Sequence, residues 1–131
     1  MTSPSEPNKR TAGYQRVKTA IGYSFAGFRY AIQYETAIRE ELLALAVLVP
    51  ISALLPVTNM EHLVLVLSMM LVVLVEFVNS AIESTVDRIS TDRHPLSGRA
   101  KDLASGAVFI AVLMSGLCWV VIAGPVVFRW V

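Results

Sequence analysis

The fold is decided by residues 62–88, HLVLVLSMMLVVLVEFVNSAIESTVDR, where a long apolar run passes directly into a polar segment. The run from residue 62 to residue 75 has 14 residues and no Asp, Glu, Lys or Arg. A membrane-spanning helix needs about 20 predominantly apolar residues, so this run spans only if the helix continues through Glu76 to about Ile82. The stretch therefore predicts a transmembrane helix at about 62–86, with a carboxylate inside the membrane boundary.

Two further stretches without acidic or basic residues are long enough to span a membrane. They run from residue 42 to 60, with 19 residues, and from residue 103 to 128, with 26 residues. They predict transmembrane helices at about 42–60 and about 101–128. Together with the helix at 62–86, they indicate an all-α membrane protein with three spans.

The composition agrees with a membrane protein. The chain has 131 residues, which is room for one domain. Hydrophobic residues make up 55%, above the roughly 45–50% of average proteins, and charged residues make up 16% against about 25%. Mean hydropathy is +0.61. A net charge of +1 does not favour a nucleic-acid partner, and seven glycines with one cysteine exclude collagen-like and disulfide-rich classes.

A second kind of helix is predicted before the first span, at about residues 14–34. Six apolar residues there share about 80° of arc on a helix. They are Tyr14, Val17, Ile21, Phe25, Phe28 and Ile32. We interpret this pattern as an amphipathic helix on the membrane surface, the alternative being a helix that packs on a soluble partner. Residues 1–12 are predicted to be a disordered leader, and residues 13–131 a single domain.

The basic residues are concentrated before the first span and in the predicted loop at 83–102. Ten of the eleven lie there: Lys9, Arg10, Arg16, Lys18, Arg29, Arg39, Arg88, Arg93, Arg99 and Lys101. The eleventh, Arg129, follows the third span. Because Lys and Arg accumulate on the cytoplasmic side, we expect a multi-pass protein with its N-terminus cytoplasmic and its C-terminus outside.

The polar end of the second span carries a stripe of possible ligands. Glu76, Asn79, Glu83 and Asp87 are spaced by 3, 4 and 4 residues, so they share about 80° of arc. Hard oxygen ligands of this kind suit Mg²⁺ rather than Zn²⁺. Intramembrane carboxylates usually mark function, and the alternatives are hydrogen bonding between helices or an ion pathway. Glu35 falls on the apolar arc of the first helix, as a helix-end residue in water or a group turned toward the stripe.

At this point four patches of the chain resemble the bacterial integral-membrane diacylglycerol kinase family, which includes undecaprenol kinases. The pattern E-x-x-N-[ST]-A-x-E-x-x-x-D is met at residues 76–87, and A-K-D at residues 100–102. Upstream, G-Y-S at 22–24 and E-x-A-x-R-x-E at 35–41 also match. The resemblance covers about residues 13–130, and it implies a surface helix plus three membrane helices assembled as a homotrimer with shared sites.

The resemblance also implies roles for single residues. Glu76 matches the catalytic base, while Glu35 and Glu83 match the carboxylates that hold the ATP-bound Mg²⁺. The implied ATP-binding positions are Arg16, Tyr23, Glu35, Glu83, Asp87, Asp92, Arg93, His94, Lys101 and Asp102. The implied lipid-binding positions are Arg16, Ala20, Gly22, Tyr23, Ser24, Phe25, Arg29, Ala37, Arg39, Glu41, Glu76, Asn79 and Ser105.

These observations predict a lipid kinase of the bacterial inner membrane that uses ATP and Mg²⁺ to convert 1,2-diacylglycerol into phosphatidic acid. Undecaprenol kinase is the alternative within the class, since Pro95 in the sequence His94-Pro95-Leu96 fits that branch. The SGRAKD segment at 97–102 fits the diacylglycerol branch better. From other classes, a small transporter with an ion pathway and a non-catalytic scaffold remain as alternatives.

Overall fold

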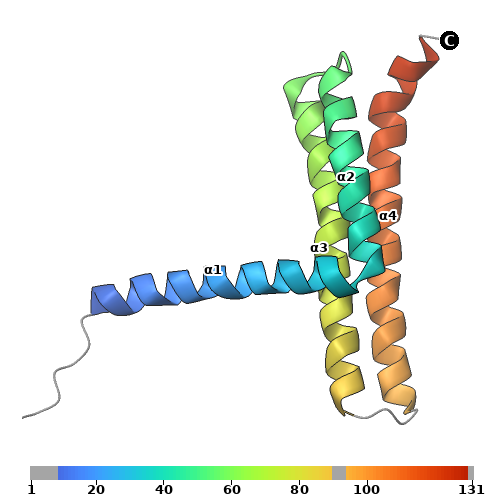
Figure 1. The fold of residues 1–131 in the computed structure, drawn as a ribbon. Coiled ribbons are helices and arrows are strands. Elements are labelled where there is room, and N and C mark those ends of the chain that lie inside the picture. The colour runs from blue at the N-terminus through green and yellow to red at the C-terminus, as the bar shows by residue number, and fades with distance from the viewer. Residues whose placement is uncertain (1–8, 90–93, 130–131) are drawn as a thin grey trace, which may run out of the picture. The chain divides into compact units, whose positions relative to one another are not determined.

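The computed structural model describes residues 9–89 and 94–129, with side chains from residue 13 onward, and this part of the chain contains helices and short connections but no strand. It contains four helices in the order α1 (Lys9–Tyr34), α2 (Thr36–Leu54), α3 (Asn59–Ile89) and α4 (Pro95–Phe128) (Figure 1). The predicted all-α class is confirmed. The chain divides into two compact units, one ending at Tyr34 and one beginning at Glu35.

The first unit contains α1, which has 26 residues. This helix begins earlier than predicted, because residues 9–12 of the expected leader are already helical. The last helix-breaking residue before α1 is Pro7, so nothing in the Lys9–Ala12 segment opposes an earlier start. The six side chains of the predicted apolar face are all exposed, with Phe25 at 73% and Phe28 at 47% as the extremes.

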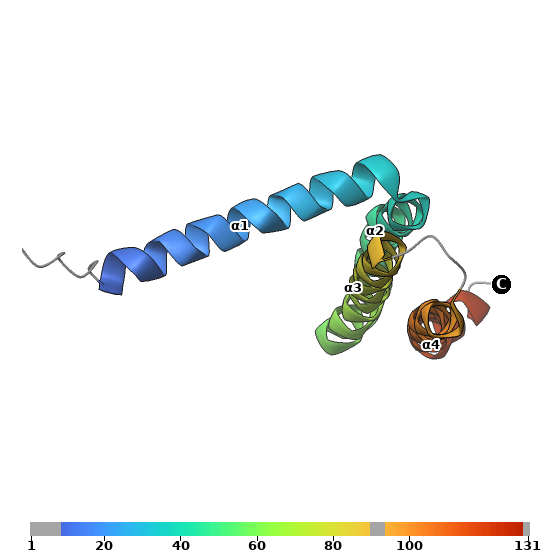
Figure 2. The ribbon, with the colours of Figure 1, turned by 90° about the horizontal axis from the view of Figure 1, so that it is seen from below.

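The second unit consists of α2, α3 and α4, which run alongside one another (Figures 1 and 2). The central helix is α3, because it contacts both α2 and α4. Its buried residues are Leu65, Met69, Val72, Glu76 and Asn79, which recur every three or four positions and so define one face. The buried residues of α4 are small, namely Ala104, Ala111 and Ser115, which allows the two backbones to approach closely.

The helix ends of the second unit are set by local chemistry. Before α3, Thr58 and Glu61 form a capping box, in which the Thr58 hydroxyl accepts from the Glu61 N–H at 3.3 Å and Glu61 Oε2 accepts from the Thr58 N–H at 2.7 Å. Before α4, His94 Nδ1 accepts from the Leu96 N–H at 3.2 Å, and Pro95 occupies the first helical position. These caps fix where the two long helices begin.

Among the described residues, two helices are long and apolar enough to cross a membrane, α3 with 31 residues and α4 with 34. The helix of the second predicted span does continue through Glu76, since α3 is unbroken as far as Ile89, and its position in a membrane stays a prediction. The predicted loop at 83–102 is much shorter than expected, because α4 already begins at Pro95. Pro95 suits the first turn of a helix, where no backbone donor is lost.

The first predicted span differs from the structure at both ends. Helix α2 has 19 residues and ends at Leu54, two residues before Pro56, whereas the prediction extended to Met60. It also begins before the uncharged stretch and includes Arg39, Glu40 and Glu41. With three charges in its first two turns, α2 is not among the helices that qualify as spans by length and composition within the described residues.

Candidate carboxylate site

The predicted polar stripe lies on the inward face of α3 and emerges toward the end of that helix. Glu76 and Asn79 are buried, each with 8% of its surface exposed, Glu83 is half-buried and Asp87 is exposed. The stripe therefore begins inside the second unit and ends at the surface near the α3–α4 connection.

Glu76 is a buried acid surrounded by other acids. Glu35, Glu41 and Glu83 each interact electrostatically with it. Among the described residues, no Lys, Arg or His forms an ion pair with Glu76. Removing a carboxylate from water is costly when no cation compensates it. The uncompensated buried carboxylate therefore destabilises the folded state of a single chain. An environment of this kind is found at catalytic carboxylates.

Two buried oxygen atoms near Glu76 have no hydrogen-bond partner in the described part of the chain. Asn79 donates through Nδ2 to Glu83 Oε1 at 3.4 Å, but its own Oδ1 is buried and accepts nothing. Glu41 Oε2 is also buried without a donor. An unsatisfied buried acceptor costs about 1–3 kcal/mol, so both atoms are suited to accept hydrogen bonds from a ligand.

Across the described residues, no three His, Cys, Asp or Glu side chains are close enough to hold a metal ion by themselves. Mg²⁺, however, is usually held by one or two carboxylates together with water and substrate phosphates. Glu35 and Glu83 are two carboxylates that are both half-buried and both interact electrostatically with Glu76.

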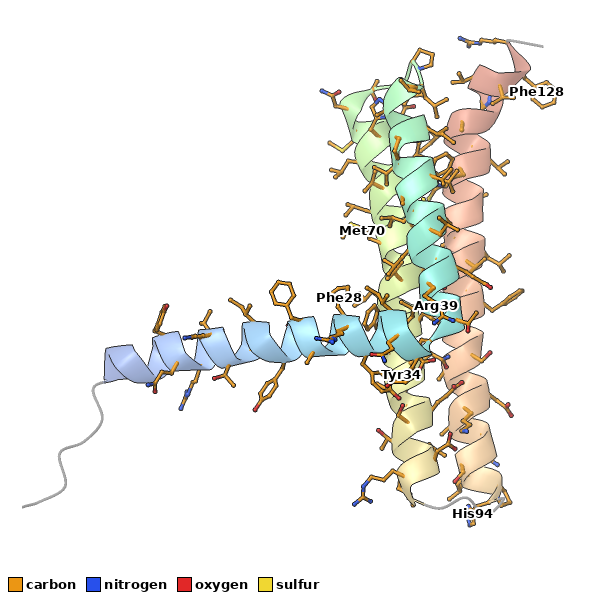
Figure 3. The ribbon with its side chains drawn as sticks, viewed as in Figure 1. Phe28, Tyr34, Arg39, Met70, His94 and Phe128 are labelled. Atoms are coloured by element: carbon orange, nitrogen blue, oxygen red, sulfur yellow. The ribbon has the colours of Figure 1, made fainter. Side chains whose placement is uncertain are left out.

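The predicted nucleotide residues of α3 and α4 gather at one end of the second unit. Lys101 Nζ of α4 lies 2.6 Å from Asp87 Oδ1 of α3, and both side chains are accessible, at 37% and 63%. Asp102 follows on α4 and is exposed. His94 marks the same end in Figure 3. Asp92 and Arg93 lie outside the described residues.

The predicted residues of α2 and Ser105 occupy different environments. Glu35 is the N-cap of α2 and is half-buried, although its side chain makes no capping bond. Arg39 donates from Nη2 to Thr36 Oγ1 at 2.9 Å and is exposed, as are Ala37 and Ser105. Glu41 is half-buried, and Glu35 and Glu41 are the members of this group that interact electrostatically with Glu76.

The predicted residues of the first unit lie within residues 16–29, nearly four turns of α1. All are exposed, and Ser24 Oγ donates to the Ala20 carbonyl at 3.0 Å. They are Arg16, Ala20, Gly22, Tyr23, Ser24, Phe25 and Arg29. Their roles stay predictions, because the structure describes α1 by itself.

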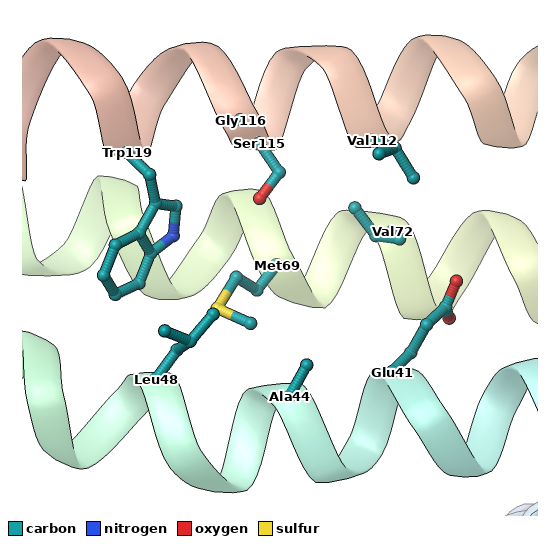
Figure 4. A pocket seen from close by; sticks show the side chains of 9 residues that line it. All are labelled: Glu41, Ala44, Leu48, Met69, Val72, Val112, Ser115, Gly116 and Trp119. Atoms are coloured by element: carbon teal, nitrogen blue, oxygen red, sulfur yellow. The ribbon is translucent and has the colours of Figure 1, made fainter.

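An apolar crevice between α2, α3 and α4 was missed by sequence reasoning. It has a volume of about 450 Å³, with Glu41 near one end and Trp119 near the other (Figure 4). Trp119 Nε1 is buried and has no acceptor within the described residues. In the middle, Ser115 Oγ lies 3.3 Å from Ser68 Oγ of α3. Ser68 and Ser115 are polar residues inside apolar runs, and they are the sequence signal that could have indicated the crevice.

These features define a helical membrane protein with a buried carboxylate site toward one end of its long helices. A family model described as "Prokaryotic diacylglycerol kinase" matches residues 22–123. The chain belongs to the prokaryotic diacylglycerol kinase family.

Curated relatives agree with the family match. The chain is 44% identical over 120 residues to the diacylglycerol kinase of Pseudomonas aeruginosa. The aligned region covers 92% of this chain and 97% of the relative. The chain is also 44% identical over 112 residues to the Escherichia coli K12 diacylglycerol kinase, with coverages of 86% and 92%. The diacylglycerol kinase of Haemophilus influenzae is 41% identical over 110 residues, with coverages of 84% and 93%.

Proposed function

We propose that this chain phosphorylates the free hydroxyl of 1,2-diacylglycerol with ATP, giving phosphatidic acid and ADP. The observation that carries the proposal is the buried Glu76 carboxylate, which has no compensating cation among the described residues, in a family named for this activity.

In the reaction, Glu76 accepts the proton of the lipid hydroxyl as that oxygen attacks the γ-phosphorus of ATP. One P–O bond forms to the lipid oxygen, and the P–O bond to the β-phosphate breaks with its electron pair leaving on ADP. Burial keeps Glu76 away from bulk water, so its negative charge acts strongly on the hydroxyl. The unsatisfied Asn79 Oδ1 is available to orient a donor of the substrate.

Mg²⁺ enters as part of the nucleotide substrate, where it neutralises phosphate charge. Glu35 and Glu83 are the residues we propose to hold it, and Asn79 orients Glu83 through its 3.4 Å hydrogen bond. Lys101 can exchange its contact with Asp87 for a phosphate oxygen, because the ion pair is partly open to water. The exposed Asp102 and His94 stand at the same end as further nucleotide contacts.

The membrane arrangement is part of the proposal. We place α2 in the membrane as a third span beside α3 and α4, because it is a predominantly apolar helix packed along α3. The apolar face of α1 lies on the membrane surface. The concentration of Lys and Arg before α2 and around the α3–α4 connection supports a cytoplasmic N-terminus, an external C-terminus and the bacterial inner membrane.

A homotrimer completes the proposal. The three helices of the second unit and the single helix of the first are few to enclose both a nucleotide and a lipid. Much of α4 is exposed in one chain, including Phe109, Leu113 and Leu117, although this helix is long enough to span. Neighbouring subunits and lipid are the partners that we expect to cover this surface.

Diacylglycerol is favoured over undecaprenol because the three relatives described above are diacylglycerol kinases by name. The test is ATP consumption by the purified full chain in vesicles with Mg²⁺ and either diacylglycerol, undecaprenol or no added alcohol. We expect ADP formation that requires diacylglycerol and yields phosphatidic acid. Equal activity with undecaprenol would overturn the substrate assignment, and lipid-independent ATP consumption would overturn the kinase assignment.

A further inference from the structure

A second pocket, which we call the far-end pocket, lies at the opposite end of the second unit from the α3–α4 connection. Its volume is about 330 Å³. One wall is the α2–α3 turn and the first turn of α3, including Pro56 and Glu61, and the other is the last turns of α4, including Ile122 and Arg129. Both walls lie at the end where Phe128 is labelled (Figure 3). The proposed reaction uses none of these residues.

The far-end pocket holds two opposite charges that do not pair with each other. Glu61 Oε2 accepts from both the N–H and the hydroxyl of Thr58, each at 2.7 Å, which fixes the carboxylate. Its Oε1 accepts no hydrogen bond from the described residues. The Arg129 N–H bonds to the Val126 carbonyl at 3.2 Å, while the guanidinium has neither ion pair nor hydrogen bond within residues 9–89 and 94–129. The pocket thus offers one fixed anion and one available cation.

The far-end pocket also lies at a defined depth when α4 spans the membrane. The uncharged stretch at 103–128 ends immediately before Arg129. A helix rises about 1.5 Å per residue and the hydrocarbon core is about 30 Å thick, so this stretch is long enough to place Arg129 among lipid head groups. Val121 and Ile122 of α4 form an apolar wall about two turns deeper than Arg129.

The combination of charges and depth selects a ligand. A guanidinium binds a phosphate with paired hydrogen bonds, and a carboxylate oxygen accepts from an ammonium group. A quaternary ammonium has no hydrogen to donate, and a head group with only negative charge meets repulsion from Glu61. We propose that the far-end pocket binds the head group of a phospholipid that carries a phosphate and a primary ammonium, with its acyl chains against the apolar wall.

The test is retention of short-chain phospholipids by the purified full chain in mild detergent, counted by native mass spectrometry. We expect phosphatidylethanolamine to be retained about tenfold more than phosphatidylcholine or phosphatidylglycerol. Arg129→Gln should reduce that retention about tenfold, whereas Arg129→Lys should keep most of it. Glu61→Gln keeps a side chain that completes the capping box, so it should fold and lose the preference for phosphatidylethanolamine over phosphatidylglycerol.

Two matched controls remove the same charges from exposed positions elsewhere, Lys18→Gln on α1 and Glu40→Gln on α2. Both should retain phosphatidylethanolamine as the parent chain does. Equal retention of the three lipids, or an unchanged preference in Glu61→Gln, would overturn the proposal. Displacement of the lipid by an equal concentration of soluble phosphoethanolamine would assign the site to a free metabolite and overturn it as well. Retention is measured without ATP, so failure of the proposed kinase activity leaves this result unaffected.

Discussion

Helix α3 carries one acid at each end of its apolar run, and the two acids differ in how their charge is satisfied. Glu61, in the first turn, accepts two hydrogen bonds from Thr58 and completes the helix start. Glu76, four turns later, is 8% exposed and interacts with three other carboxylates. Glu61 is satisfied by hydrogen bonds within the fold, whereas no cation among the described residues compensates Glu76.

The largest expected effect is therefore on the activity of a Glu76 variant. Glu76→Gln removes the proton acceptor while keeping the shape of the side chain, so kcat should fall by roughly 10²–10⁴-fold. The measurement is phosphatidic acid formation at saturating ATP and diacylglycerol, together with the melting temperature in detergent.

Glu61→Gln is the matched control, since it makes the same substitution on the same helix. It should keep kcat within about twofold of the parent chain, because a glutamine still completes the capping box. A Glu76→Gln variant that folds and retains full activity would remove Glu76 from the role of base. Equal losses in both variants would remove the distinction between the two acids.

A smaller effect is expected at Asn79, which positions Glu83. Asn79→Leu removes the amide that bonds to Glu83 Oε1, so the Mg²⁺ concentration for half-maximal activity should rise roughly 10–100-fold. Ser80→Ala, at the neighbouring half-buried position, is the control and should leave the Mg²⁺ concentration for half-maximal activity unchanged. An Asn79→Leu enzyme with lower kcat but an unchanged Mg²⁺ dependence would contradict this role.

The nucleotide end of the site can be tested through Lys101. Lys101→Met removes a charge that we expect to contact phosphate, so KM for ATP should rise roughly tenfold while KM for diacylglycerol stays the same. Asp87→Asn breaks the same ion pair from the other side. Because accessible ion pairs contribute little to stability, neither variant should shift the melting temperature much. A large fall in the melting temperature of both variants would instead show that the ion pair between Lys101 and Asp87 stabilises the fold.

Much of α3 and of its stripe could be predicted from the sequence, because both depend on periodicity within one helix. The run from 62 to 75 was too short to span, and that shortage alone required the helix to include Glu76. The spacing of Asn79 and Glu83 then placed them on the same face. The sequence T-x-x-E at 58–61 also matches the pattern of a capping box.

Features that depend on the pairing of helices could not be predicted in this way. The contact between Lys101 and Asp87 requires the register of α4 against α3, and local periodicity contains no information on that register. The crevice between Glu41 and Trp119 depends on three helices at once. Helix α2 ends at Leu54, before the end of the uncharged stretch that predicts the span, because Pro56 is a stronger signal for the end of a helix than the absence of charge.

The smallest expected effect is at the far end of α3. Thr58→Ala removes the hydroxyl that accepts from the Glu61 N–H, and loss of such a cap costs about 1 kcal/mol. We expect a fall of roughly a few degrees in melting temperature with no change in kcat or in either KM. Thr58→Ser keeps the hydroxyl and should behave as the parent chain. If Thr58→Ala instead lowered kcat at a temperature where the protein is folded, the capped end of α3 would be coupled to Glu76, and the two acids would no longer be independent.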